Sequence, residues 1–264
     1  MAALLRALWA YRGFILGSIQ REFQAKYRNS LLGAAWTILN PLATILVYTV
    51  IFAEVMRSRL PGVENTFGYS IYLCAGVLTW GYFAEIVGRS QTVFIDSANL
   101  LKKLSFPRFC LPLIIIGGAT LNFTIIFSLF TVFLIFSGNF PGLPFLAIFP
   151  LLGLLVLFAI GLGTTLGVLN VFFRDVGQFF GIFLTFWFWL TPIVYPVGAL
   201  SESIRSLLAW NPMTGLIVAF QDICVSRQWP HWSTLWPLAL LAVVLCAVGL
   251  RLFRRHAGEM VDEL

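Results

Sequence analysis

Six long apolar stretches constrain this chain more than any other feature of its sequence. Each is about as long as a helix that crosses the hydrocarbon core of a bilayer, roughly 20 residues. The six are residues 32–56, 67–88, 109–137, 145–172, 176–194 and 233–253. A soluble domain has no need of six such segments, and the 264 residues are 59% hydrophobic and only 11% charged. The sequence therefore predicts an all-α integral membrane protein whose transmembrane domain, 32–253, has six transmembrane helices.

The basic residues divide unevenly between the two sides that these spans define. The segments 1–31, 89–108, 173–175 and 254–264, together with Arg251, hold 13 Lys and Arg, whereas the opposite side holds 4. Because Lys and Arg gather on the cytoplasmic side, we expect both termini and the tail 254–264 in the cytoplasm. The same distribution accounts for the net charge of +6 without a nucleic acid partner.

The N-terminal segment 1–31 ends in an amphipathic stretch. Its apolar positions recur every fourth residue, and its polar positions lie on a neighbouring helical face. The apolar residues are Ile19, Phe23 and Tyr27, and the polar ones are Gln20, Arg21, Gln24 and Arg28. A helix with this pattern can lie in the headgroup plane, so we expect an interfacial helix that leads into the first span.

Two features inside the spans each have two interpretations. Asn40-Pro41 in the first span is either a tolerated kink or a hinge near a cytoplasmic gate, because proline removes a backbone hydrogen bond. The small-residue pairs Gly163…Gly167 and Gly177…Gly181 allow helices to approach closely. They serve either packing within one subunit or the interface of a homodimer.

The connection 89–108 contains a short predicted helix. Asn99 is a suitable N-cap, and Pro107 ends the helix at or before Phe106. Three leucines gather on it beside two exposed lysines: Leu100, Leu101, Leu104, Lys102 and Lys103. This helix is either an apolar plug for a groove on a cytosolic partner or a solvated, positively charged loop.

Aromatic residues concentrate in the fifth span and the segment 195–232 that follows it. In that segment two apolar stretches, Ser201–Ala209 and Met213–Cys224, are each too short to cross a bilayer. We therefore expect an external re-entrant helical hairpin before the last span. The aromatic side chains form either an interfacial belt or a set of flat surfaces for passing sugar rings. The candidates for a substrate pathway are Trp187, Trp189, Tyr195 and Trp210.

Two motifs carry a resemblance to a known family. One is Tyr27-Arg28-Asn-Ser-Leu-Leu-Gly33-Ala-Ala-Trp36 with Asn40-Pro41-Leu42 after it, and the other is Asn99-Leu-Leu-Lys-Lys followed by Phe106-Pro107-Arg108. With the span number and motif order, they make the chain resemble the permease subunits of type-2 ABC exporters. The group it resembles exports lipid-linked polysaccharide, namely O-antigen, capsular polysaccharide and teichoic acid.

The resemblance implies a channel-forming permease subunit in the bacterial inner membrane. It implies a second copy of the chain, two nucleotide-binding ATPase subunits and an O-antigen-like lipid-linked polysaccharide as partners. In that family the N-terminal helix and the loop after the second span both contact the ATPase. By match, the contact residues here are Arg21, Glu22, Lys26, Arg28, Asn99, Leu100, Leu101, Lys102, Lys103, Leu104, Phe106, Pro107 and Arg108.

The residues themselves offer no catalytic centre. The chain has three lysines and none follows a glycine, so it lacks a phosphate-binding loop, and ATP and Mg²⁺ would be held by a separate ATPase. No Asp-rich pair for metal and diphosphate appears, and the four cysteines show no metal spacing. The alternatives are export of another lipid-linked glycan, such as capsule or teichoic acid, a membrane-embedded polyprenyl or glycosyl transferase, and a channel or scaffold.

Overall fold

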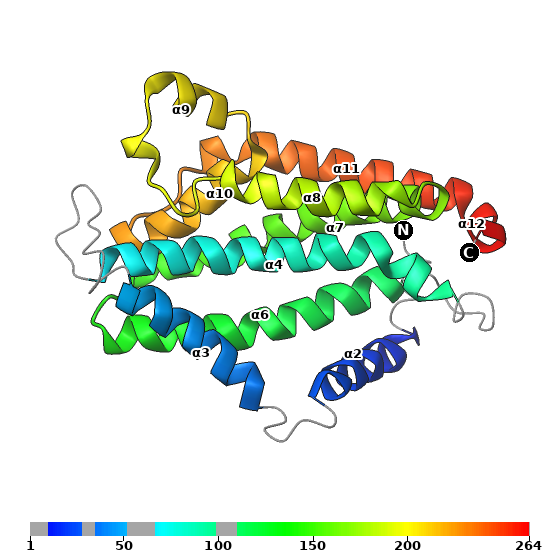
Figure 1. Cartoon of the computed structure of the whole chain (residues 1–264), viewed down its shortest axis with the longest axis horizontal. Helices are drawn as coiled ribbons and strands as arrows, with labels where there is room; N and C mark the ends of the chain where they lie inside the picture. Colours follow the sequence, from blue (N-terminus) through cyan, green and yellow to red (C-terminus); the bar gives the residue numbers. More distant parts are fainter. Residues whose placement is uncertain (1–9, 28–34, 52–66, 99–109, 264) are drawn as a thin grey trace.

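The computed structural model describes residues 10–27, 35–51, 67–98 and 110–263, and all regular structure in these segments is helical (Figure 1). The helices are α2 (Arg12–Tyr27), α3 (Trp36–Thr49), α4 (Gly68–Asp96), α6 (Cys110–Phe136), α7 (Ile148–Phe172), α8 (Asp175–Trp189), α9 (Glu202–Leu208), α10 (Pro212–Gln221), α11 (Trp236–His256) and α12 (Glu259–Glu263). A 3-10 turn, Leu143–Ala147, leads into α7, and a π-helical turn, Asp222–Ser226, follows α10. The prediction of an all-α protein is confirmed for the part of the chain described.

Four helical segments are long and apolar enough to cross a membrane: Gly68–Asp96, Cys110–Phe136, Leu143–Phe172 and Trp236–His256. They match the predicted second, third, fourth and sixth spans. The pair Glu202–Leu208 and Pro212–Ser226, bent by 104°, is either a fifth, broken span or a re-entrant loop. The described residues therefore support four or five spans, and six spans are not confirmed.

The predicted first and fifth spans contain α3 and α8. Within the first, 32–56, the described helix α3 has 14 residues, and residues 32–34 and 52–56 lie outside the described part of the chain. Within the fifth, 176–194, α8 has 15 residues and is about 23 Å long at 1.5 Å per residue, against about 30 Å for the hydrocarbon core. A physical reason for the end of α8 is Pro192, since the residue before a proline avoids helical backbone angles.

The second span is longer than predicted. The predicted span ends at residue 88 and the predicted connection begins at residue 89, whereas α4 continues as one helix to Asp96. This last part of α4 packs into the bundle, because Ser90, Val93 and Phe94 are buried. The Phe94 ring stacks on Phe253 of α11 at 5.4 Å between ring centroids.

The core is centred on α7, which packs against α4 on one side and α11 on the other, while α6 packs against α4. Close approach of α4 and α7 depends on two glycines. A Cβ at Gly163 would lie 2.5 Å from Ser90 Cβ, and one at Gly167 would lie 2.5 Å from the Ser90 carbonyl oxygen. The pair Gly163…Gly167 thus serves packing within one subunit, which is one of the two roles predicted for it.

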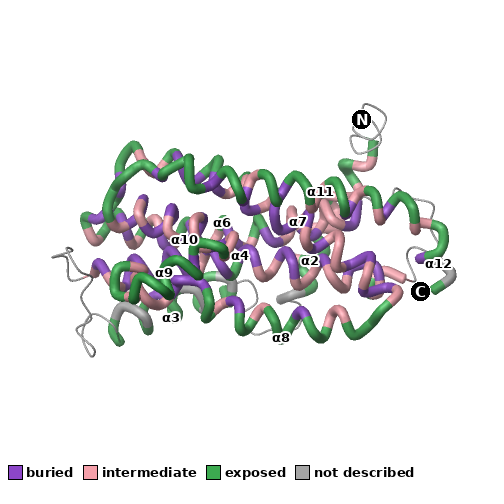
Figure 2. Tube along the Cα trace, turned by 90° about the horizontal axis from the view of Figure 1, so that it is seen from above, coloured by how far each residue is buried: buried purple, intermediate pink, exposed green. Residues whose placement is uncertain are grey.

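Burial divides the bundle into an inner and an outer set of surfaces (Figure 2). In the membrane-length segment of α4, 67% of the residues are buried inside the bundle. The corresponding share is 28% in α6 and 22% in α11. The short helix α9 stands away from the other helices (Figure 1). Helix α2, at the N-terminal end of the described chain, packs against α6.

Candidate functional site

The residues predicted to contact an ATPase are only partly within the described structure. Arg21 and Glu22 lie on α2, and the backbone of Lys26 belongs to the same helix. Arg28 and the predicted short helix lie outside the described residues: Asn99, Leu100, Leu101, Lys102, Lys103, Leu104, Phe106, Pro107 and Arg108. The site can therefore be built from α2 and the helices that it contacts.

Glu22 joins α2 to the long helix α4 through an ion pair. Its Oε1 lies 2.5 Å from Nη2 of Arg89, which is on the seventh turn of α4. Nη1 of Arg89 also faces Oε1 of Glu85, one turn earlier on α4, at 3.5 Å. One guanidinium therefore lies between two carboxylates from different helices.

The same cluster extends to α6 through Asn122. The Nδ2 of Asn122 donates a hydrogen bond to Oε2 of Glu85 over 3.0 Å. Glu85 thus uses one oxygen for Arg89 and the other for Asn122. We call Glu22, Arg89, Glu85 and Asn122 the α2 latch, because together they connect α2, α4 and α6.

Two glycines on α6 make room for α2. A Cβ at Gly117 would lie 2.2 Å from Cδ1 of Ile19, and one at Gly118 would lie 3.2 Å from Nη1 of Arg89. A cavity of about 30 Å³ remains between Ile19, Phe23 and the latch residues. Any larger residue at Gly117 or Gly118 would displace Ile19 or the guanidinium. We call this contact surface on α6 the α2 seat.

Exposure and charge set the strength of the latch. The side chains of Glu22, Arg89 and Glu85 are 43%, 31% and 28% exposed, so water reaches all three. Arg21, predicted beside Glu22, takes no part, because its Nη2 donates to Ser18 Oγ on its own helix over 3.0 Å. Partly exposed ion pairs contribute about 0.2–1 kcal/mol each, so the latch can hold α2 in place and can also be opened.

The predicted substrate residues fall into two groups. Trp187 is buried, with its ring edge-on to Trp80 at 5.7 Å between centroids. Trp189 and Trp210 are 60% and 87% exposed. Tyr195 is partly buried and donates from its hydroxyl to the Trp189 carbonyl oxygen over 2.8 Å. A hydrogen bond therefore joins Tyr195 to Trp189, whereas Trp187 is buried and Trp210 is exposed.

Asn211 holds the end of α8 against the start of α10. Its Oδ1 accepts from the indole N–H of Trp187 at 2.8 Å and from the Met213 amide at 3.0 Å. Its Nδ2 donates to the Leu190 carbonyl and to Thr191 Oγ1, both at 3.0 Å. The predicted break at Asn211-Pro212 is thus a tightly bonded corner.

A second set of bonds fixes the chain between α8 and α9. The hydroxyl of Tyr72 donates to the carbonyl oxygens of Pro192 and Tyr195, and Gln221 donates to that of Pro192 over 3.1 Å. Two helices far apart in sequence, α4 and α10, therefore hold this irregular segment in place.

Sequence reasoning missed Arg89, Glu85, Asn122 and Asn211 as members of a site. A signal for the first two was present, since oppositely charged residues four positions apart lie on one face of a helix. Within the described residues no group of three or more His, Cys, Asp or Glu side chains could hold a metal ion.

Comparisons with known proteins agree with the helical architecture. A family model described as "ABC-2 type transporter" matches residues 15–225. The chain is 34% identical to the O-antigen export system permease protein RfbA of Myxococcus xanthus over all of both proteins. It is 29% identical to a protein of that name from Klebsiella pneumoniae, over 89% of this chain and 88% of the relative. It is 23% identical to the polysialic acid transport protein KpsM of Escherichia coli, over 91% and 92%.

Proposed function

The chain belongs to the ABC-2 type transporter family, and from that premise we propose that it is the permease subunit of an exporter for an O-antigen-like, lipid-linked polysaccharide. The observation that carries the proposal is the full-length similarity, at 34% identity, to an O-antigen export permease. The weaker similarity to a polysialic acid transport protein makes capsule export the second candidate.

The chain would act with a separate ATPase. It has no phosphate-binding loop, because none of its three lysines follows a glycine. ATP and Mg²⁺ would therefore be bound by two ATPase subunits at the cytoplasmic face of a dimer of this chain. This chain would supply the channel and the surfaces through which ATP-driven movements act.

In the proposed topology the chain crosses the inner membrane six times, with both termini in the cytoplasm. The unequal distribution of basic residues supports this orientation. Helices α3 and α8 would complete the first and fifth spans. The bent pair α9 and α10 would form a re-entrant hairpin on the outer side, supported by its 104° bend and by the bonds of Asn211.

The ATPase would contact α2 and the predicted helix 99–106. The α2 latch supports a mechanical role for both, because it joins α2 to α4, and α4 ends at Asp96, three residues before Asn99. A movement of either contact would then reach the same transmembrane helix. ATP binding would draw the ATPase subunits together and move α4 in both copies of the permease.

The sugar polymer would pass beside the exposed aromatic rings near the outer side. Trp189 and Trp210 are the accessible members of the predicted pathway, and Tyr195 borders them. Flat aromatic faces contact successive sugar rings without fixing any one of them.

The test is reconstitution. Vesicles containing the purified chain and its ATPase should move lipid-linked O-antigen across the bilayer in the presence of ATP, whereas an ATPase variant without hydrolysis should not. In cells that lack the chain, surface glycan should disappear while lipid-linked glycan accumulates inside. Loss of the lipid-linked glycan itself would instead indicate a transferase, and the composition of the accumulated glycan separates O-antigen from capsule.

A further inference from the structure

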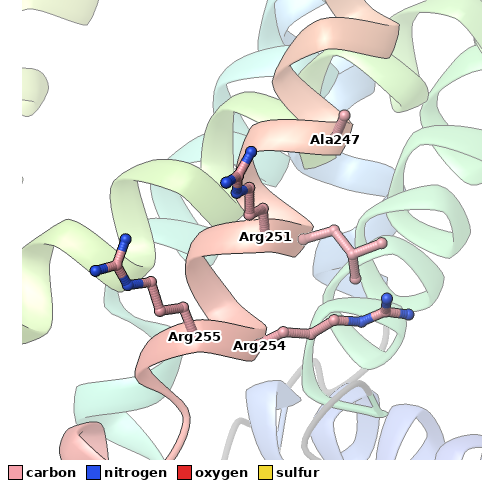
Figure 3. Close-up of a pocket in the computed structure, with 5 residues that line it drawn as sticks. Ala247, Arg251, Arg254 and Arg255 are labelled. Atoms are coloured by element: carbon pink, nitrogen blue, oxygen red, sulfur yellow. The ribbon is translucent and has the colours of Figure 1, made fainter.

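Three arginines at the end of α11 line an open groove of about 480 Å³, together with Ala247 and Leu250. Figure 3 shows Arg254 and Arg255 projecting to opposite sides of the helix, with Arg251 one turn earlier between them. All three side chains are exposed. We call this set the α11 arginine groove.

The three guanidinium groups have no carboxylate partner among the described residues, in contrast to Arg89. On the neighbouring helix α12, Glu259 pairs with His256 instead, whose Nδ1 lies 2.7 Å from Oε2 of the glutamate. Three exposed positive charges within five residues are thus arranged to meet an anion. Planar guanidinium groups match phosphate oxygens with two parallel hydrogen bonds.

An apolar surface leads directly into this groove. Leu240, Val244, Ala247 and Arg251 follow one another at helical spacing on one face of α11, and all four are exposed. The distance from Leu240 to Arg251 is about 16 Å along the axis, close to half of the roughly 30 Å hydrocarbon core. The face is therefore apolar over one leaflet and basic at its end.

This face is turned away from the rest of the subunit. The residues of α11 that pack inward are Leu238, Ala242, Gly249 and Phe253, on the opposite side of the helix. Gly249 allows the approach to α7, since a Cβ there would lie 2.9 Å from Thr165 Oγ1. What covers the apolar face must therefore come from outside the subunit.

We propose that the α11 arginine groove binds the phosphate headgroup of an anionic membrane phospholipid, with one acyl chain lying along Leu240, Val244 and Ala247. The length of the apolar face and the charge at its end both match such a lipid. A second copy of the chain fits less well, because two parallel α11 helices meeting on this face would bring six guanidinium groups together.

The first test uses the full-length protein in a neutral detergent and native mass spectrometry. Phosphatidylglycerol should be retained at least about tenfold better than phosphatidylcholine, since clustered basic residues attract anionic lipids. Replacing Arg251, Arg254 and Arg255 together by Gln should bring the two lipids to within about twofold. The matched control removes two arginines that bond backbone carbonyls instead, Arg205→Gln with Arg227→Gln, and should keep the preference.

A preference that survives in the triple Gln variant would refute the proposal. Because that variant loses charges that orient the chain, a second measurement uses the unaltered protein. Phosphatidylglycerol with a photoreactive group in its acyl chain should label residues 240–248. Labelling confined to other helices, retention of a polyprenyl diphosphate more than about tenfold above phosphatidylglycerol, or a disulfide between two copies of a Val244→Cys variant would each identify another occupant and overturn the proposal.

Discussion

The ion pair between Glu22 and Arg89 can be tested by reversing its charges. In Arg89→Glu, the carboxylate at position 89 would face Glu22 on α2 and Glu85 on its own helix, so two attractions become two repulsions. In the double variant Glu22→Arg with Arg89→Glu, the attraction between α2 and α4 returns with its direction exchanged. Only the pair with Glu85 stays repulsive.

The expected size of the effect follows from the exposure of the pair. Side chains that are 31% and 43% exposed form a pair worth about 0.2–1 kcal/mol. Reversing Arg89 replaces its attraction to Glu22 by a repulsion of similar size, so α2 should lose about 0.4–2 kcal/mol of its preference for the seat on α6. Since 1.4 kcal/mol is a factor of ten, the ratio of seated to unseated α2 should fall by up to about tenfold. The double variant should recover most of that free energy, because the pair with Glu85 lies within α4.

Two measurements report this loss. One is disulfide formation between cysteines at positions 19 and 117, because a Cβ at Gly117 would lie within 3.1 Å of Cγ1 of Ile19. The other is ATP-driven export by the reconstituted complex. Arg89→Glu should lower both, and the double variant should raise both again. If Arg89→Glu leaves cross-linking unchanged, or if the double variant is no better than Arg89→Glu, the latch does not position α2.

Three further predictions concern the outer end of the bundle and the topology. Asn211→Ala should lower the free energy of unfolding by about 2–3 kcal/mol, measured by thermal melting, because four hydrogen bonds at the corner between α8 and α10 are lost. Trp187→Leu should lower the melting temperature, because the Trp187 ring is buried. Trp189→Leu should leave the melting temperature unchanged and slow export, because the Trp189 ring is exposed. If Trp189→Leu exports as fast as the parent protein, Trp189 is not part of the pathway. A cysteine at 203 should react with an impermeant reagent from outside and one at 258 only after lysis, and the reverse pattern would overturn the proposed orientation.

The helical class and four spans followed from composition and length because both are local properties of the sequence. The ends of the spans did not, because a helix ends where its packing ends. The second predicted span ends at residue 88, just before the charged Arg89. In the structure two carboxylates accompany it, and α4 continues for seven more residues to Asp96.

Of the candidate site, only the α2 residues could be predicted from the sequence. Glu22 was identified by the family resemblance, but its partner Arg89 lies 67 positions further along the chain. Nothing in local periodicity links such distant residues. The aromatic residues show the same limit, because Trp187 and Trp189 look alike in sequence although packing buries one and leaves the other exposed.

The continuity of α4 also explains how a movement at the latch would reach the centre of the bundle. Arg89 and Phe83 are six residues apart on one uninterrupted helix, or about 9 Å along its axis. The Phe83 ring stacks on Phe158 of α7 at 5.4 Å between centroids and meets the buried Trp187 edge-on at the same distance. Because α4 contains no proline between these positions, displacement of its end would shift Phe83 with it. A displacement that begins at α2 would then be transmitted along α4 to α8 and to the corner at Asn211.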